Sequence, residues 1–292
     1  KRMRYGAVDI GTNSCRLLIA EQENNQKLKR LARELETTRI GEGINLSPLL
    51  KEEAMARTLD CLSRFSEKMR EYEVDEYKAV ATSAVRGAEN GAEFVRQAEI
   101  QSGMAVAIVS EQEEARLSYE GVRRELELTQ PPLVIDLGGG STEFICPDQD
   151  ILLSVPLGAV RAAEADMSAG QISDLMKQGG VLAVTPGSRP VVMVGGTASS
   201  LAAIKKGLPE YDPELVHGEI LSRGEIGDLY NLLERMPLAL RRRLPGLQPE
   251  RADIINKGAL IILIIMEILG QKEIIVSESD LLEGIIWSLP DR

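Results

Sequence analysis

The sequence contains few aromatic residues, few cysteines and a single histidine. Only 3% of its 292 residues are aromatic, so the core has to be built from aliphatic side chains. The cysteines Cys15, Cys61 and Cys146 are widely spaced and form no Cys-x-x-Cys pair, and His217 is the one histidine. This pattern excludes a cysteine–histidine zinc site and a disulfide framework. It predicts a protein of the reducing cytoplasm.

Long apolar runs and an excess of positive charge are also missing. The most apolar run, Ala259–Met266, is far shorter than the ~20 residues that span a bilayer, so it predicts a buried helix. No secretory signal is recognised near the start of the sequence. A net charge of -11 argues against broad binding to nucleic acid. We therefore expect neither a membrane nor a nucleic acid as a partner.

One motif occurs twice, at residues 7–17 and again at residues 134–144. Each copy is an apolar strand, an Asp, a Gly, a small polar turn and a second apolar strand. In the alignment of the two copies, Asp9, Gly11 and Ser14 match Asp136, Gly138 and Ser141. Such a turn presents backbone N–H groups that bind anionic oxygens, and Gly permits close approach. One copy alone is usually a plain hairpin, but two copies in register favour a phosphate-binding pair.

The pattern of elements around each copy predicts a duplicated α/β fold. Strands are expected at 4–10, 15–21 and 28–36, and a similar meander restarts at 133–137, 142–147 and 150–155. Helices are expected at 49–71, 92–101, from 110 and from 279, with further strands at 77–81, 105–109, 191–194 and 273–276. The Thr129–Pro132 stretch is the clearest linker. We predict one domain at 1–126 plus 283–292 and a second at 127–282, with the two turns meeting at an interdomain cleft.

Several charged residues are candidates for chemistry at these turns. Asp136 and Glu143 flank the second turn and are suited to share a Mg²⁺, which takes one or two carboxylates plus phosphate oxygens. Glu114 lies in the first turn of a predicted helix, where spacing alone does not separate a catalytic role from service to the helix dipole. Arg16 and Arg86 follow turns and are candidate phosphate clamps, with a surface ion pair as the ordinary alternative.

Other common phosphate-binding and nucleophile motifs are missing from the sequence. There is no Gly-x-x-x-x-Gly-Lys-Ser/Thr, no dinucleotide-binding Gly-x-Gly-x-x-Gly after a strand, and no Gly-x-Ser-x-Gly elbow.

Taken together, the motifs resemble the exopolyphosphatase and guanosine pentaphosphate phosphohydrolase family, a branch of the superfamily of acetate and sugar kinases, Hsp70 and actin. The resemblance runs nearly end to end. The segments that carry it are 8–14, 81–86, 113–117, 134–143, 156–161 and 251–255. It implies two ribonuclease H-like (actin-like ATPase) domains with an interdomain cleft.

The resemblance also implies hydrolysis of the terminal phosphoanhydride of inorganic polyphosphate, with release of orthophosphate. Glu114 falls on the catalytic glutamate and would be the general base, while Asp136 and Glu143 would hold Mg²⁺. The implied phosphate-binding residues are Gly11, Thr12, Asn13, Ser14, Arg16, Arg86, Gly138, Gly139, Gly140, Ser141, Thr142 and Arg251.

Alternatives stay open at this point. Guanosine pentaphosphate is an alternative substrate, and a non-catalytic sensor of such nucleotides would keep the same cleft. A sugar-kinase-like phosphotransferase would need an adenosine site, for which Gly195-Gly196-Thr197 is a candidate. Association into a homodimer is a further open alternative.

The sequence departs from the family pattern near its end. Asp280 and Leu282 stand where a Gly and an Arg are expected. Because Asp tolerates the left-handed conformation better than most residues, we expect the turn to survive, whereas any role of the Arg is unsupported. The sequence ends where longer members continue into a helical region, so we expect reduced grip on long polymers.

Overall fold

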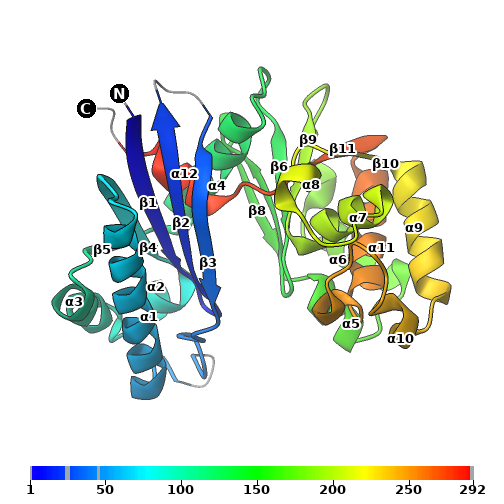
Figure 1. Cartoon of the computed structure of the whole chain (residues 1–292). Helices are drawn as coiled ribbons and strands as arrows, with labels where there is room; N and C mark the ends of the chain where they lie inside the picture. Colours follow the sequence, from blue (N-terminus) through cyan, green and yellow to red (C-terminus); the bar gives the residue numbers. More distant parts are fainter. Residues whose placement is uncertain (1, 24–26, 45–46, 290–292) are drawn as a thin grey trace. The chain divides into compact units, whose positions relative to one another are not determined.

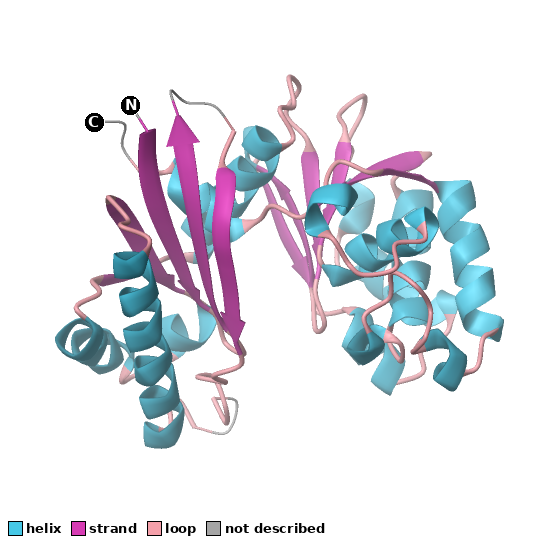
Figure 2. Ribbon diagram, in the orientation of Figure 1, coloured by secondary structure: helices cyan, strands magenta, loops and turns pink. Residues whose placement is uncertain are grey.

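The computed structural model describes residues 2–23, 27–44 and 47–289, which fold into helices and two mixed β-sheets (Figures 1 and 2). The chain divides into two compact units. Unit 1 comprises Lys1–Glu125 with Asp280–Arg292, and unit 2 comprises Leu126–Ser279.

Unit 1 is a five-stranded sheet with helices on both faces. Its strands lie in the order β3-β2-β1-β4-β5. The strands are β1 (Arg2–Ile10), β2 (Cys15–Glu23), β3 (Lys29–Glu36), β4 (Glu76–Ala81) and β5 (Val106–Ile108). The helices are α1 (Glu52–Glu71), α2 (Ser83–Gly87), α3 (Gly91–Ser102), α4 (Glu111–Glu125) and α12 (Leu281–Trp287).

The two faces of this sheet follow from the alternation of side chains along each strand. Val8 and Ile10 of β1 belong to the core that includes buried residues of α1 and α3. Tyr5 and Ala7 belong to the core that includes residues of α4 and α12. Asp9 shares the parity of Tyr5 and Ala7, so it points to the face covered by α4 and α12.

Helices α4 and α12 approach each other closely at two glycines. A Cβ on Gly121 would overlap the carbonyl oxygen of Asp280, and a Cβ on Gly284 would overlap that of Leu117. Helix α12 therefore packs closely against α4, and segments from both ends of the chain belong to unit 1.

Unit 2 is a six-stranded sheet in the order β10-β11-β9-β6-β7-β8. Its strands are β6 (Leu133–Leu137), β7 (Thr142–Cys146), β8 (Ile151–Val155), β9 (Val191–Val194), β10 (Ile220–Ser222) and β11 (Glu273–Ser277). Its helices are α5 (Ala159–Glu164), α6 (Ala169–Gln178), α7 (Gly196–Lys206), α8 (Pro213–Val216), α9 (Arg223–Arg235), α10 (Leu238–Arg241) and α11 (Ile255–Ile268).

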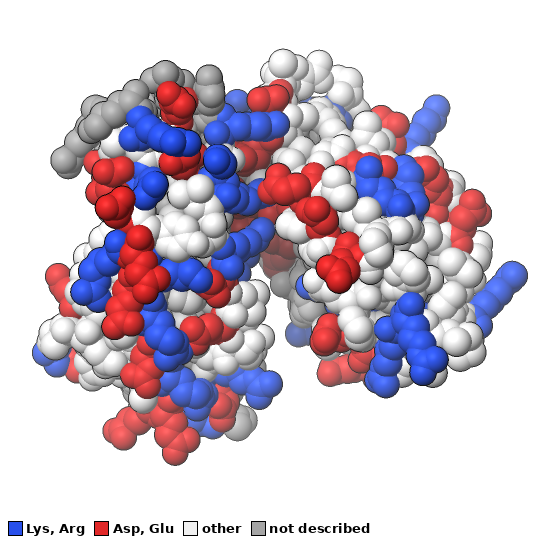
Figure 3. All heavy atoms as spheres, in the orientation of Figure 1, with Lys and Arg blue, Asp and Glu red and all other residues white. Residues whose placement is uncertain are grey.

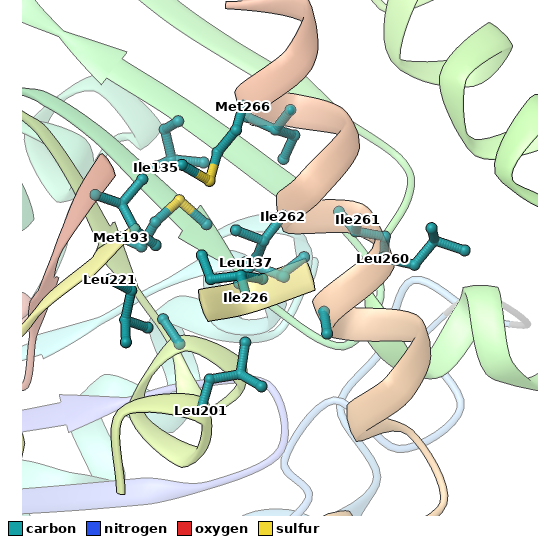
Figure 4. Close-up of a cluster of buried hydrophobic side chains, with 14 of the residues drawn as sticks. Ile135, Leu137, Met193, Leu201, Leu221, Ile226, Leu260, Ile261, Ile262 and Met266 are labelled. Carbon is teal, nitrogen blue, oxygen red and sulfur yellow. The ribbon is translucent and has the colours of Figure 1, made fainter. Parts of the chain in front are cut away.

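Helix α11 lies at the centre of the unit 2 core (Figure 4). Its buried residues Ile261, Ile262 and Met266 belong to one hydrophobic cluster with Ile135 of β6 and Met193 of β9. The prediction that Ala259–Met266 forms a buried helix is confirmed. Among the described residues, no helix is both long enough and apolar enough to cross a membrane.

The two units repeat one topology, which confirms the predicted α/β fold class. The order β3-β2-β1-β4-β5 of unit 1 corresponds to β8-β7-β6-β9-β11 of unit 2, with β10 added at the edge. In both copies the first two strand pairs are antiparallel, and the first strand is parallel to the one that follows a helix. The short edge strand β10 was not predicted from the sequence.

Candidate active site

The first Gly-containing turn joins β1 to β2 in unit 1. The amide of Gly11 donates to the carbonyl oxygen of Ser14 at 3.0 Å and closes the turn. The tip residues Thr12 and Asn13 are exposed. Strand pairing then places Asp9 directly opposite Arg16, so the side chains of both lie on the face that α4 and α12 cover.

Asp9 and Arg16 form a largely buried ion pair beside this turn. The Nε and Nη2 groups of Arg16 donate to Oδ2 of Asp9 at 2.9 and 2.7 Å. The other oxygen, Oδ1, is buried and has no hydrogen-bond partner among the described residues. Burial raises the pKa of Asp9, and Arg16 opposes that rise.

Arg16 has a second carboxylate partner, because its Nη1 group donates to Oδ2 of Asp280. Asp280 is also the N-cap of α12: its Oδ1 accepts from the amide of Leu282 at 3.0 Å, and its own amide donates to Glu283. The Arg16 guanidinium therefore joins the strand of the first turn to the start of the last helix.

The two departures from the family pattern, Asp280 and Leu282, both lie at the start of α12. Asp280 has φ -147°, which is extended, so the expected left-handed conformation is wrong. Capping α12 and pairing with Arg16 require the extended N-cap geometry instead. Leu282 is fully buried in the core formed by the sheet, α4 and α12. Its side chain contributes to apolar packing there.

A second segment closes on the first turn and was missed in the sequence. The amides of Arg39 and Gly41 donate to the carbonyl oxygens of Asn13 and Thr12, both at 2.9 Å. Arg39 adopts a left-handed φ of 50°, which is unusual for a residue with a side chain. A Cβ on Gly41 would overlap Thr12. Gly41 in the Arg-Ile-Gly-Glu-Gly stretch was the available sequence signal for this contact, because a Gly can mark a close approach of two backbones.

Glu114 projects from the first turn of α4 in unit 1. Ser110 caps the start of this helix, since its Oγ accepts from the amide of Glu113 at 3.1 Å. Glu114 accepts instead from Nη1 of Arg86 at 3.0 Å, and the same Nη1 also donates to the carbonyl oxygen of Val109. Burial raises the pKa of Glu114, Arg86 lowers it, and the charge of Asp9 raises it further.

The second Gly-containing turn joins β6 to β7 in unit 2 and has the same closing bond. The amide of Gly138 donates to the carbonyl oxygen of Ser141 at 3.0 Å. Gly139 and Gly140 at its tip are exposed. The hydroxyl of Thr142 is buried and donates to the carbonyl oxygen of Leu157 at 2.6 Å, so it supports the hairpin rather than the turn surface.

Asp136 and Glu143 are directly opposite each other on β6 and β7, so their carboxylates lie on one face of the hairpin. Glu143 also accepts from the hydroxyl of Ser154 at 3.0 Å. An added Cβ on Gly195 would lie 3.4 Å from Oδ1 of Asp136. The Gly at this position, with φ 108°, thus keeps the start of α7 close to that carboxylate.

Arg251 is the last phosphate-binding candidate, and it lies in unit 2 beside α7. Its guanidinium covers Gly196, where a Cβ would overlap it, and its Nε donates to Gln248 at 2.9 Å. Gly195 and Gly196 therefore provide the close helix start against which Arg251 rests. These packing contacts are what the structure shows for the Gly195-Gly196-Thr197 segment.

The residues of the second hairpin fit a hard divalent cation better than those of the first. Asp9 faces Arg16 in unit 1, whereas the equivalent positions in unit 2 are Asp136 and Glu143. Magnesium is usually held by one or two carboxylates together with waters and substrate phosphates, which this pair provides. Within the described residues, no group of three or more His, Cys, Asp or Glu side chains could enclose a metal by itself.

Charges elsewhere on unit 1 largely pair with one another. Over β3 and α1 the positive and negative side chains alternate (Figure 3), because Arg64 pairs with Glu36 and Lys68 pairs with Glu34. Anion binding in this unit therefore has to rely on turn amides and on individual arginines rather than on a broad basic surface.

Similarity searches identify the class of protein that this fold and these turns define. The chain belongs to the Ppx/GppA phosphatase family, whose model matches residues 18–292. Proteins of the wider superfamily, which share the actin-like fold, generally use a divalent metal.

Individual relatives agree with this assignment. The chain is 31% identical over 316 residues to exopolyphosphatase 2 of Mycobacterium tuberculosis, covering 98% of each protein. It is also 31% identical over 304 residues to a bifunctional 3-dehydroquinate synthase/phosphatase of Fusobacterium nucleatum. That match includes 96% of this chain, but the chain spans only 46% of the length of this relative. The crystal structure of the Aquifex aeolicus family member matches with a TM-score of 0.88 at 28% identity, covering 99% of this chain and 97% of that one.

Proposed function

We propose that this protein is an exopolyphosphatase that removes the terminal phosphate of inorganic polyphosphate. The observation that carries the proposal is Glu114, a carboxylate on α4 whose burial raises its pKa and whose orientation is fixed by Arg86. A raised pKa makes a carboxylate a better general base near neutral pH. The similarity of the whole chain to an exopolyphosphatase supports the same reaction.

In the proposed reaction, a water molecule attacks the terminal phosphorus. The bond from that phosphorus to the bridging oxygen breaks, the shortened polyphosphate leaves with the bridging oxygen, and orthophosphate is released. Glu114 accepts the proton of the attacking water through the oxygen that Arg86 leaves available. Phosphoryl transfer needs mainly positioning and neutralisation of charge, so the remaining residues act as phosphate ligands.

The proposed phosphate ligands come from the turn of unit 1 and from the turn of unit 2. The turns Gly11–Ser14 in unit 1 and Gly138–Thr142 in unit 2 would hold phosphate oxygens with the amides at their tips, because the amides of Gly11 and Gly138 already close the turns. Arg16, Arg86 and Arg251 would bind further phosphates.

We further propose that Asp136 and Glu143 hold Mg²⁺, which when bound would neutralise charge on the transferred phosphoryl group. The hairpin supplies the two carboxylates on one face, and substrate oxygens and waters would complete the coordination. A cytoplasmic location suits the three buried, unbridged cysteines.

The test is phosphate release from long polyphosphate, tripolyphosphate and guanosine pentaphosphate, measured in parallel with Mg²⁺. Glu114→Gln should lower turnover ~10²-fold or more, as expected for loss of a general base. Glu113→Gln is the matched control, because Glu113 points to Arg116 on the same helix turn and should leave turnover unchanged. Release from the nucleotide alone would move the assignment to guanosine pentaphosphate hydrolysis, and release from none of the three would overturn the proposal.

A further inference from the structure

Arg16, one of the proposed phosphate ligands, is already occupied by two carboxylates of unit 1. Its Nε and Nη2 groups both donate to Oδ2 of Asp9, and its Nη1 group donates to Oδ2 of Asp280. The side chain of Arg16 remains 23% exposed beside the first turn. A phosphate that binds Arg16 must therefore compete with a carboxylate that the protein itself supplies.

The two carboxylates differ in how easily they can be displaced. Asp9 is deeply buried on β1, and its pair with Arg16 offsets the cost of that burial. Asp280 lies at the point where the chain passes from unit 2 into unit 1 and is 17% exposed. Displacing Asp9 would strand a buried charge, which is costly, so Asp280 is the partner that can be replaced.

A second arginine can keep Asp280 paired when Arg16 is withdrawn. Nη2 of Arg33 lies 3.9 Å from the same Oδ2 of Asp280. Arg33 lies on the α12 face of β3, because strand pairing sets it opposite Leu18, a residue of the core beneath α12. The capping bond from Leu282 uses the other oxygen, Oδ1. Asp280 can thus release Arg16 without losing its cap or all of its positive neighbours.

We propose that Asp280 competes with substrate phosphate for Arg16 and thereby sets how tightly this protein binds phosphate there. The proposal rests on the proposed function, since it concerns a phosphate-binding residue of that site. With Asp280 bound, Arg16 serves mainly to orient Asp9. A substrate gains the Arg16 contact only by offering a phosphate oxygen that outcompetes the carboxylate.

The discriminating variant is Asp280→Asn. The amide oxygen of Asn can still cap α12, but the negative charge that holds Arg16 is gone. Dissociation constants for tripolyphosphate would be measured by calorimetry with Mg²⁺, in a Glu114→Gln background that prevents turnover. We expect Asp280→Asn to bind about fivefold more tightly, the change that ~1 kcal/mol of a partly exposed ion pair represents.

The control is Asp166→Asn, which removes one negative charge from the exposed Asp166, the partner of Lys257 in unit 2. It should leave the dissociation constant unchanged, so that a general effect of net charge is excluded. Unchanged or weaker binding in Asp280→Asn would overturn the proposal, as would an equal gain in Asp166→Asn.

A double-mutant cycle tests whether the effect passes through Arg16. In an Arg16→Gln background, Asp280→Asn should change the dissociation constant by less than about twofold. Because Arg16→Gln leaves Asp9 unpaired, thermal unfolding must show that this variant folds; if it does not, the cycle is run in an Asp9→Asn/Arg16→Gln background, where no buried carboxylate is left without its arginine. A full fivefold gain without Arg16 would refute the competition. Binding is measured without turnover, so failure of wild-type protein to release phosphate would count against the proposed function alone.

Discussion

The role of Arg86 can be tested through the pH dependence of catalysis. Glu114 acts as a base only when it is deprotonated, so kcat/KM should fall as pH drops through the pKa of Glu114. Burial raises that pKa above its usual range, while Arg86, 3.0 Å away, lowers it. Removing the positive charge in Arg86→Gln should therefore raise the pKa and move the acidic limb of the pH profile to higher pH.

The size of the shift follows from the geometry. An opposite charge within 4–6 Å lowers a carboxyl pKa by about one to three units. The side chains of Glu114 and Arg86 are each about 30% exposed, and solvent screens such pairs, so we expect the low end, about one unit. At a pH below the pKa of Glu114 in both proteins, kcat/KM as a fraction of its plateau should be about tenfold lower in the variant than in wild type.

The assay is kcat/KM for tripolyphosphate across pH at fixed ionic strength and saturating Mg²⁺. Arg86 is also a proposed phosphate ligand, so its loss lowers the plateau, but only the position of the limb reports on Glu114. Arg86→Lys keeps the charge and should hold the limb near its wild-type position. An Arg86→Gln limb that coincides with wild type would show that Arg86 does not set the pKa of the base.

Two further predictions concern the metal and the fold. EDTA should abolish phosphate release, and added Mg²⁺ should restore it. Asp136→Asn or Glu143→Gln should raise the Mg²⁺ concentration needed for half-maximal activity. Full activity without divalent ions would refute the metal assignment. Gly284→Ala should destabilise unit 1 by at least ~2 kcal/mol in denaturant unfolding, since the new Cβ overlaps the Leu117 carbonyl. Gly227→Ala on α9, where a Cβ meets nothing within 4 Å, should instead be neutral or stabilise by up to ~1 kcal/mol; equal effects would contradict the packing argument.

The parts of the fold that the sequence predicts are those with a local signal. Both hairpins could be predicted because strand alternation and a Gly-rich turn lie within a dozen residues of each other. The buried helix α11 follows from its continuous apolar run. In the same way, the hydrogen bond from Glu113 to Ser110 follows from their spacing.

Features that depend on distant residues could not be predicted. Arg16 and Asp280 are 264 positions apart in the chain, and no periodicity links them. The expected left-handed turn at Asp280 was wrong because tolerance of a conformation does not determine which one is adopted; capping and ion pairing decided it. The buried hydroxyl of Thr142 likewise depends on Leu157, which lies beyond the hairpin.

The duplicated hairpins show how one scaffold serves two electrostatic tasks. Aligned on their turns, Arg16 of the first hairpin takes the position that Glu143 takes in the second. Each hairpin therefore presents an aspartate beside one variable partner on the same face. In unit 1 the partner is a cation built into the chain, so the Asp9 carboxylate is neutralised without help from solution. In unit 2 the partner is a second carboxylate, Glu143, so the facing pair brings two negative charges together. One substitution within a repeated motif thus gives the second copy the two carboxylates that a divalent ion prefers.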